Sequence, residues 1–542
     1  MRFKKTFIIV LALIGISAGT VNNDRLYEIS KNIEIFINVY KELNANYVDD
    51  LDPNQLMRVG LDAMVGSLDP YTNYISESQV SSYMINTEGK YEGIGAVVEL
   101  IDDYITIVEP YDGSPVVEAG LKAGDQIIAI EGESTYGKTR EEVTAFYRGV
   151  PGTEVRLKIR TIDGEEKTVD IKRSEVNLPN VPYSGFVDDN VGYIALTTFT
   201  PDASKNIKSA LRRLKNENYN MEGLILDLRN NGGGLLREAI AISNIFIEKD
   251  KEVVSVKSKV KERDQSYKTM EEPVDTEIPV VVLINKNSAS ASEIVSGVLQ
   301  DYDRAVLMGQ RSYGKGLVQN TKEVGYRSRI KLTTSKYYIP SGRCIQSVKY
   351  ENGEPVDIPD DKRSKFKTSN GRIVLDGGGV SPDVKLDLEE ASELLNALRK
   401  QHVIFKFANQ YIENLDTAET VEEVQFTDYQ AFLDFVDKSE FSYQTEAEKH
   451  LEKFMEKSQS DNTTGISEEI QRIQAVVDQQ KEKAFEMYKD EIIQDIQIEL
   501  ATRLYYQTGK VYQRLKNDSE IDAAVDLIKD TMRYSDILAP IH

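Results

Sequence analysis

The 542-residue sequence predicts a multidomain protein, with an α/β domain and a smaller α+β module between helical regions at both ends. A chain of this length exceeds what one hydrophobic core serves. Strand-like and helix-like segments alternate between residues 180 and 390, which is typical of α/β architecture. Residues 391–542 are rich in Glu, Lys and Gln and poor in Gly and Pro, as amphipathic helices are.

The first 21 residues have the pattern of an export signal. Arg2, Lys4 and Lys5 precede an apolar run at residues 7–18, which is too short to span a bilayer comfortably. We therefore expect a signal peptide or an uncleaved anchor at residues 1–21, and a protein of the periplasm or cell envelope. A buried N-terminal helix is the alternative. No cysteine follows the run, so a lipoprotein anchor is excluded.

Two smaller regions are expected to follow this segment. Apolar residues recur at helical spacing from Ile29 to Tyr40, and a second helix is expected at 53–65, so residues 25–85 are assigned to a helical region. Short β-like runs, separated by Gly and Asp, occupy residues 86–176 with two helical pieces among them. This pattern predicts an α+β module of the size of one domain.

The α/β domain is assigned to residues 180–390. Its run at residues 279–284 is almost continuously apolar, as expected for a strand covered on both faces. The polar stretch at 255–275 is expected to be a surface hairpin or loop. The other expected strands are 191–197, 223–228, 305–308 and 328–338, and the expected helices begin at Thr200, Leu235 and Ala291.

The C-terminal region is expected to contain one long helix. Apolar residues from Ile466 to Leu504 keep a spacing of three to four residues over about ten turns. Such a helix packs on its own chain or forms a homodimer contact, and the sequence leaves both alternatives open.

Composition excludes several kinds of partner and site. With 66 basic and 89 acidic residues the net charge is −23, which argues against nucleic acid and anionic lipid as partners. Cys344 is the only cysteine, so no intrachain disulfide or cysteine-based metal site can form. The three histidines, His402, His450 and His542, all follow residue 401. We expect no metal and no cofactor.

A serine-rich segment follows the most apolar strand. Residues 285–292 read NKNSASAS, and a helix is expected from Ala291. The Ser290 hydroxyl would lie at the end of the sheet, where ligands bind in α/β proteins, and the Ala291 amide at the helix N-terminus could stabilise an oxyanion. Ser290 and Glu293 also fit a helix capping box, so this segment alone does not decide between the two roles.

A serine nucleophile needs an adjacent base. A Ser-His-Asp triad would have to recruit one of the C-terminal histidines. The remaining common base is a lysine whose pKa is lowered by burial. Lys315 lies between two glycines in the segment 312–316, again after a strand. Taken alone, this segment is equally typical of a solvated turn.

Two glycine-containing loops offer exposed amides. The segment DLRNNGGG at 227–234 ends a strand and could supply an oxyanion donor or cradle an anion, although its spacing fits neither the Walker nor the dinucleotide pattern. Gly93, Ile94, Gly95 and Ala96 open the α+β module. Their amides could bind a terminal carboxylate, and the strand that follows could accept a peptide. An ordinary turn is the alternative for each loop.

Together these segments resemble the C-terminal processing peptidases, also called tail-specific proteases. The resemblance runs from about residue 26 to about residue 390 and depends on the order and spacing of several motifs. The motifs are YEGIGAVV (91–98), SPVVEAGLKAGDQIIAIEG (114–132), DLRNNGGG (227–234), SASASEIVSGVLQDYDRA (288–305), GKGLVQ (314–319), KYYIPSGRCIQ (336–346) and GGGVSPDV (377–384).

The resemblance implies a catalytic dyad. Ser290 corresponds to the nucleophile and Lys315 to the general base, 25 residues later as in the family. Gln319 corresponds to the residue that orients the lysine amine, and Asp301 to an acidic position sometimes grouped with the dyad. The Ala291 amide, with that of Gly233 or Gly234, corresponds to the oxyanion hole.

The resemblance also implies the fold and the activity. Residues 86–176 resemble a PDZ domain that reads protein C-termini, and residues 180–390 a crotonase-like α/β peptidase core. The expected function is a serine endopeptidase that acts on proteins with accessible C-terminal tails. Gly232 stands where the family often has proline, which should loosen that loop. A catalytically silent PDZ scaffold and a crotonase-like acyl-binding protein are the alternatives.

Overall fold

The computed structural model describes residues 23–540. The gaps are residues 78, 81–82, 84–89, 139–142, 144–146, 347, 352–353, 358, 388–390, 413–419 and 461–466. The predicted export signal therefore lies outside the described residues. Among those described, no helix combines the length and apolar character needed to cross a membrane. The chain divides into two compact units, residues 1–74 with 351–354, and residues 75–350 with 355–542.

The N-terminal unit contains the two helices that the sequence predicts. They are α2 (Asn23–Asn46) and α3 (Pro53–Gly66). Helix α3 begins after Asp52, whose side chain accepts hydrogen bonds from the amides of Asn54 and Gln55. Most large apolar side chains of α2 are exposed in this unit, for example Ile33 at 48%. The short strand β1 (Asn73–Ile75) follows.

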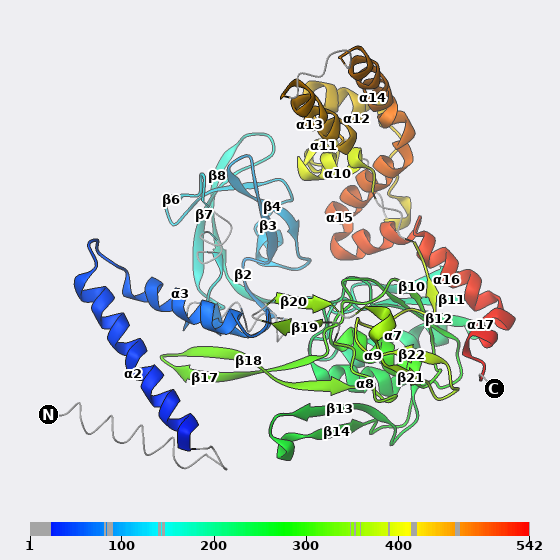
Figure 1. The fold of residues 1–542 in the computed structure, drawn as a ribbon. Helices are drawn as coiled ribbons and strands as arrows, with labels where there is room; N and C mark the ends of the chain where they lie inside the picture. The colour runs from blue at the N-terminus through cyan, green and yellow to red at the C-terminus, as the bar shows by residue number, and fades with distance from the viewer. Residues whose placement is uncertain are drawn as a thin grey trace. The chain divides into compact units, whose positions relative to one another are not determined.

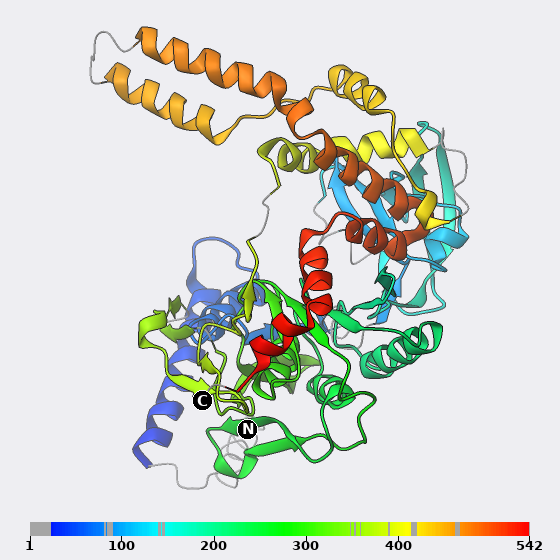
Figure 2. The ribbon, with the colours of Figure 1, turned by 90° about the vertical axis from the view of Figure 1, so that its right-hand side faces the viewer.

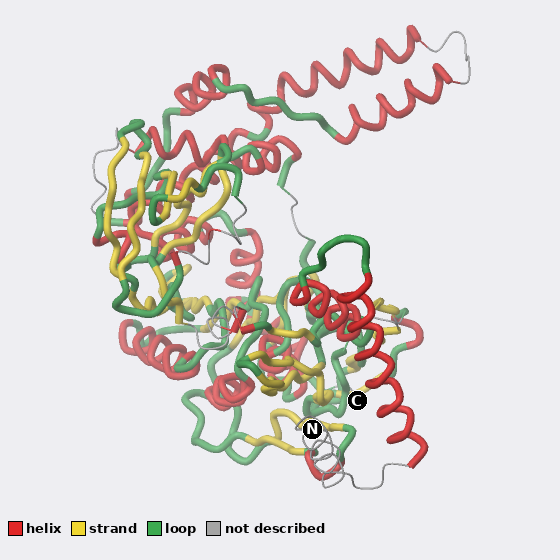
Figure 3. The backbone as a smooth tube through the Cα atoms, turned by 90° about the vertical axis from the view of Figure 1, so that its left-hand side faces the viewer, coloured by secondary structure: helices red, strands yellow, loops and turns green. Residues whose placement is uncertain are grey.

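The α+β module has one sheet in the order β3-β4-β5-β7-β8, with β6 beside β5. Figure 3 draws the strands of the chain in yellow. Strand β3 starts directly after the loop of residues 93–95 and forms the edge of this sheet, while β2 pairs with β9 separately. The predicted helix at 139–147 lies largely outside the described residues. The elements are β2 (Lys90–Gly93), β3 (Ala96–Ile101), β4 (Tyr104–Pro110), α5 (Pro115–Glu118), β5 (Gln126–Ile130), β6 (Glu133–Ser134), β7 (Glu154–Arg160), β8 (Glu166–Lys172) and β9 (Ser174–Asn177).

The α/β domain is built on a six-stranded sheet in the order β10-β11-β12-β15-β16-β23. Strands β10, β11 and β12 are labelled in Figure 1. Strand β10 is antiparallel to its neighbour and the others are parallel. Every residue of β11, β12 and β15 is buried, because helices cover both faces. The strands are β10 (Ser184–Asp188), β11 (Val191–Ala195), β12 (Gly223–Asp227), β15 (Val280–Ile284), β16 (Val306–Gly309) and β23 (Val384–Lys385).

The two faces of this sheet are covered by helices from different parts of the chain. Helices α7 (Ala203–Glu217), α8 (Leu236–Phe246) and α9 (Ala291–Asp301) share one hydrophobic core with one face. On the other face, the C-terminal helices α16 (Ser519–Lys529) and α17 (Thr531–Leu538) pack on β12, β15 and β16. The last helices of the chain therefore belong structurally to the α/β domain.

A second, antiparallel sheet pairs β14, β13, β18 and β17 in that order. The prediction of a hairpin at 255–275 is confirmed by β13 and β14, which are joined through η1. Strands β17 and β18 form a longer hairpin after residue 316. The elements are β13 (Glu252–Ser258), η1 (Lys261–Arg263), β14 (Gln265–Lys268), β17 (Leu317–Gly325) and β18 (Ser328–Tyr338). Separate two-stranded pairs follow along the chain: β19 (Val348–Glu351) with β20 (Glu354–Asp357) and, after η2 (Asp360–Lys362), β21 (Lys365–Lys367) with β22 (Ile373–Leu375).

The C-terminal region is helical, but its long helix is divided. The chain breaks at Tyr488 (φ −104°, ψ 21°) between α14 and α15, and kinks again at Tyr506, where φ is 53°. The prediction of one continuous helix over 466–504 is therefore wrong: one non-helical residue preserves the apolar spacing, so periodicity cannot reveal the break. Figure 2 shows α13 and α14 as an antiparallel hairpin. The elements are α10 (Glu393–Lys400), α11 (Val403–Tyr411), η4 (Val421–Glu423), α12 (Tyr429–Lys438), α13 (Glu446–Ser460), α14 (Ser467–Met487) and α15 (Lys489–Leu515).

Candidate active site

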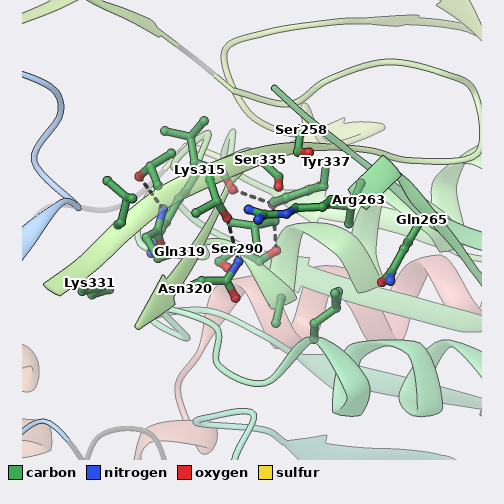
Figure 4. Close-up of a pocket in the computed structure, with 18 of the residues that line it drawn as sticks. Ser258, Arg263, Gln265, Ser290, Lys315, Gln319, Asn320, Lys331, Ser335 and Tyr337 are labelled. Atoms are coloured by element: carbon green, nitrogen blue, oxygen red, sulfur yellow. Dashed lines mark hydrogen bonds between the residues drawn. The ribbon is translucent and has the colours of Figure 1, made fainter. Parts of the chain in front are cut away.

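A cavity of about 1210 Å³ lies where the main sheet, α9 and the second sheet meet. Most of the residues that the sequence singles out in the α/β domain line it, although they come from three separate loops. Figure 4 draws Ser290, Lys315, Gln319 and Tyr337 among its lining residues. The predicted residues that line the cavity are Ser290, Ala291, Lys315, Gln319, Gly233 and Gly234.

Ser290 sits at a sharp turn between β15 and α9. Its backbone has φ 57° and ψ −111°, a combination that is costly for a residue with a side chain. Ser290 is the N-cap residue of α9, and Glu293 accepts a hydrogen bond from its amide at 2.7 Å. The residue can therefore begin the helix and line the cavity at once, so the two roles predicted for it do not exclude each other.

Glu293 joins the serine loop to the lysine loop. Its side chain is completely buried. Oε2 accepts the amides of Ser290 at 2.7 Å and Lys315 at 2.8 Å, while Oε1 accepts the Ser312 hydroxyl at 2.5 Å and the Gly314 amide at 2.6 Å. Burial raises the pKa of the Glu293 carboxyl above its ordinary value, and these donors oppose the rise. One carboxylate thus holds the backbone of both candidate dyad residues.

Tyr337 holds the same two residues from another side. Its hydroxyl lies 3.1 Å from the carbonyl oxygen of Ser290 and 2.5 Å from that of Lys315, and donates toward both. Sequence reasoning did not identify Tyr337, because nothing in the segment 336–346 marks a tyrosine for this contact. In the sequence, Glu293 fits a capping box, and its spacing of three residues from Ser290 is the signal that marks it.

The glycine loop packs directly on the serine loop. The side chain of Asn231, which is fully buried, donates to the Leu196 carbonyl oxygen at 2.7 Å and accepts the Gly233 amide at 2.9 Å. A Cβ atom on Gly233 would lie 2.8 Å from Ser290 Cβ and 2.7 Å from the Ala289 carbonyl oxygen. Gly233, at φ 96°, therefore has both a conformation and a neighbour that require glycine.

The hydrogen bonds distinguish between the two glycines proposed for the oxyanion hole. Because the Gly233 amide already donates to Asn231, it is not available to a substrate oxygen. Within the part of the chain that the structure describes, the amides of Ala291 and Gly234 donate to no protein group. These two amides are the better pair of oxyanion donors.

Gln319 and Asp301 have different surroundings. Gln319 lies on β17 at a bulge, lines the cavity and donates to the Thr333 hydroxyl at 3.2 Å. Asp301 ends α9, about 16 Å along the helix from Ser290 at 1.5 Å per residue. Its carboxylate pairs with Arg343 at 2.9 Å, where both side chains are 1% exposed. Burial raises the pKa of Asp301 and the arginine opposes that rise. The structure does not bring Asp301 to the cavity.

The predicted carboxylate loop is tightly packed in the α+β module. The carbonyl oxygens of Ile94 and Gly95 accept the amides of Val116 and Tyr111. Gly95 has φ 84°, and a Cβ atom there would lie 2.4 Å from Ser114 Cβ. Next to this loop, β3 pairs only with β4 among the described strands, so its outer edge is open. An open edge beside a glycine loop can accept an extended peptide.

The walls of the cavity are more basic than the chain as a whole. The chain has a net charge of −23, yet among the described residues that line the cavity only Glu262 is acidic. This charge separation favours acidic segments of a bound polypeptide. The basic lining residues are Lys259, Arg263, Lys315, Lys322 and Lys331.

Comparisons with known proteins agree with this organisation. The family description "Peptidase family S41" matches residues 190–353, "PDZ domain" matches 93–172, and "Probable PDZ-protease, C-terminal helical domain" matches 394–528. A probable CtpA-like serine protease of Staphylococcus aureus (strain COL) is 35% identical over 419 residues, 74% of this chain and 83% of the relative. The carboxy-terminal processing protease CtpA of Bacillus subtilis (strain 168) is 31% identical over 388 residues, 71% of this chain and 79% of the relative.

Solved structures are also similar to this chain. The photosystem II D1 C-terminal processing protease is 22% identical and covers 68% of this chain and 94% of its own, with a TM-score of 0.36. The PDZ domain of the carboxy-terminal protease from Vibrio cholerae, solved in complex with peptide, is 32% identical and covers 16% of this chain and 99% of its own, with a TM-score of 0.16. The relationship that the sequence motifs indicate is confirmed by the family matches and by these two relatives. The chain is a multidomain α/β serine peptidase of family S41 with a PDZ domain, and it belongs to the C-terminal processing peptidases.

Proposed function

We propose that this chain is a serine endopeptidase in which Ser290 is the nucleophile and Lys315 the general base. The observation that carries this assignment is the shared support of the two residues. Both line one cavity, and Glu293 and Tyr337 each bind the backbone of both. Such support keeps a nucleophile and its base in fixed register, which acyl transfer requires.

The reaction begins when neutral Lys315 takes the proton of the Ser290 hydroxyl as its oxygen attacks the scissile carbonyl carbon. The carbonyl oxygen becomes an oxyanion and is bound by the amides of Ala291 and Gly234, each donor contributing about 3 kcal/mol to the transition state. The Lys315 ammonium then protonates the leaving amine. In deacylation Lys315 takes a proton from water, the resulting hydroxide attacks the acyl carbon, and Ser290 leaves and regains its proton.

One further residue, Gln319, has a role in this route. Gln319 lies on β17, just after the loop that carries Lys315; it lines the cavity and would orient the lysine amine. No step of the route uses a metal or a cofactor. Because Lys315 must be neutral to accept a proton, cleavage is expected to become faster as pH rises.

Substrates would be selected by their C-terminal tails. The amides at Gly93–Ala96 would bind the terminal carboxylate, and the open edge of β3 would pair with the tail. The match of residues 93–172 to a PDZ domain supports this mode of binding, as does the peptide complex named for the Vibrio cholerae domain. An amidated tail should therefore be bound more weakly than a free acid.

The N-terminal segment is proposed to direct export. The charged start and apolar run of residues 1–21 support export to the periplasm or cell envelope. A fusion of residues 1–25 to a reporter tests export, and a reporter kept in the cytosol contradicts it.

For the homodimer, the exposed apolar residues of α2 support a contact between two copies, because their 4-3 spacing is that of a coiled-coil seam. They are Ile29, Ile33, Phe36 and Leu43.

The test of the dyad compares Ser290→Ala and Lys315→Ala with wild type on a denatured substrate that has an apolar C-terminus. Each variant should lose cleavage and keep tail binding, and the double variant should be no worse than either single one. Lys322→Ala, which changes another lysine of the same cavity, is the matched control and should keep cleavage. Full activity in either dyad variant would overturn the assignment and favour a silent PDZ scaffold or a crotonase-like acyl-binding protein.

A further inference from the structure

Arg229, in the glycine loop, is surrounded by three carboxylates, two of which come from the far end of the chain. Its guanidinium binds Asp227, whose Oδ2 lies 2.7 Å from Nη2. It also binds Asp518, with Nη2–Oδ2 at 2.7 Å, and Glu520, with Nη1–Oε2 at 2.6 Å. Arg229 is 13% exposed and Glu520 8% exposed. A charged group this deeply buried is held by its partners, so the position of Arg229 depends on α16.

Helix α16 is a rigid support for these two carboxylates. Asp518 is its N-cap residue and accepts the amides of Glu520 and Ile521. The helix buries Ile521, Ala524, Leu527 and Ile528 against the sheet. In the following helix, Tyr534 exchanges hydrogen bonds with the backbone of Val280, at 2.9 and 3.0 Å. Asp518 and Glu520 are therefore fixed to the strands that carry both the glycine loop and the serine loop.

The loop transmits the position of Arg229 to the oxyanion donor. Two residues beyond Arg229 is the buried Asn231, which binds the Gly233 amide and the Leu196 carbonyl oxygen. The backbone oxygen of Asn231 accepts the Ala289 amide at 3.0 Å, next to Ser290. The Gly234 amide is the next one along the chain after the Gly233 amide that Asn231 binds. A loop held at Arg229 and at Asn231 has little freedom to move that amide.

We infer that Asp518 and Glu520 are positioning residues of the peptidase: through Arg229 they hold the glycine loop so that the Gly234 amide points at the substrate oxyanion. The inference rests on the proposed oxyanion hole. It gives a catalytic role to Asp518 and Glu520, which lie outside the S41 match at 190–353 and within the C-terminal helical match at 394–528. The C-terminal region thereby completes the active site as well as the fold.

The test uses the full chain with Asp518→Asn and Glu520→Ala combined. Asparagine remains a good helix N-cap, so the start of α16 is kept while both carboxylates are removed. Lys529→Ala is the matched control, because Lys529 pairs with Asp188 at 2.7 Å from the same helix but away from the loop. A third variant, Asp518→Asn with Glu520→Gln, restores the size and an acceptor at position 520.

Three quantities separate a positioning role from a purely structural one. They are kcat and KM for a tail-bearing substrate, the affinity for a peptide aldehyde whose adduct with serine places an oxygen in the oxyanion hole, and the affinity for a free tail peptide. In the Asn/Ala variant, below its melting temperature, kcat and aldehyde affinity should both fall about 10- to 100-fold. KM and tail-peptide affinity should stay within twofold. The Asn/Gln variant should recover part of the loss, and Lys529→Ala should match wild type.

Each outcome has a definite reading. A folded Asn/Ala variant with wild-type kcat and aldehyde affinity overturns the inference, as does an equal loss in Lys529→Ala. If the Asn/Ala variant does not fold, the Asn/Gln variant decides on the same two measurements. If instead wild type does not cleave, or Ser290→Ala cleaves at the wild-type rate, the proposed dyad fails and not merely the role of α16.

Discussion

Replacing Tyr337 with phenylalanine tests whether the support of the dyad matters for catalysis. Tyr337 is 1% exposed, and its hydroxyl approaches the carbonyl oxygens of Ser290 at 3.1 Å and Lys315 at 2.5 Å. Phenylalanine keeps the ring and leaves both oxygens without this donor. A lost hydrogen bond of this kind costs about 1 kcal/mol of unfolding free energy, which lowers the melting temperature by about 2–4 °C in a domain of roughly 200 residues.

The expected effect on activity is larger than that on stability. A misplacement of about 1 Å between nucleophile and base costs about 100-fold in rate, so kcat of Tyr337→Phe should fall about 10- to 100-fold while KM is unchanged. The assay is cleavage of a denatured substrate with an apolar C-terminal tail, with thermal unfolding measured in parallel. Tyr302→Phe is the matched control, because Tyr302 donates to the Glu252 carbonyl oxygen at 2.8 Å near the far end of α9. Equal kcat in the two variants would refute the reasoning.

Three further predictions concern other parts of the site. Burial raises the pKa of the Glu293 carboxyl above its ordinary value of 4.5, so the folded state binds the carboxyl proton more tightly than the unfolded state does. The stability that this group contributes is therefore greatest below pH 4.5, falls as pH rises through the folded pKa and is constant above it. The excess stability of wild type over Glu293→Gln in urea unfolding should shrink with rising pH in this acid range, and a difference that grows with pH would contradict it. Gly233→Ala should lower kcat at least tenfold, roughly as loss of one oxyanion donor does, while Gly232→Ala, which has no neighbour within 4 Å of its Cβ position, should keep most activity; equal losses would count against the packing argument. Lys331→Glu should raise KM for substrates with acidic residues near the cleavage site, more at low salt than at high salt, and a salt-independent KM would speak against the basic cavity wall.

Local features of this chain could be read from its sequence. An apolar run in the sequence indicates the buried strand β15. Small residues, with Glu293 at the capping position, indicate where α9 begins. These features placed Ser290 and Ala291 at a helix start beside the sheet. The glycines on either side of Lys315 likewise marked a sharp bend. In each case the information lies within a few residues.

Other features depend on partners that are distant in sequence. Arg229 meets Asp518 and Glu520 across 289 and 291 residues, and no spacing rule connects them. The contact of Tyr337 with Ser290 depends on how two sheets meet. Asp301 shows the opposite case: the family resemblance groups it with the dyad, yet it pairs with Arg343 and lies at the other end of α9 from Ser290.

The energetic balance at Glu293 connects the two catalytic loops. The backbone strain at Ser290 costs about 1–3 kcal/mol, and burying a carboxylate costs several more. Four donors offset these costs, since a hydrogen bond to a charged group contributes about 1.5–3 kcal/mol. Three of the four come from the lysine loop, from Ser312, Gly314 and Lys315. If that loop moved away, the buried carboxylate would keep only the Ser290 amide as a donor, so the lysine loop stabilises the strained serine turn.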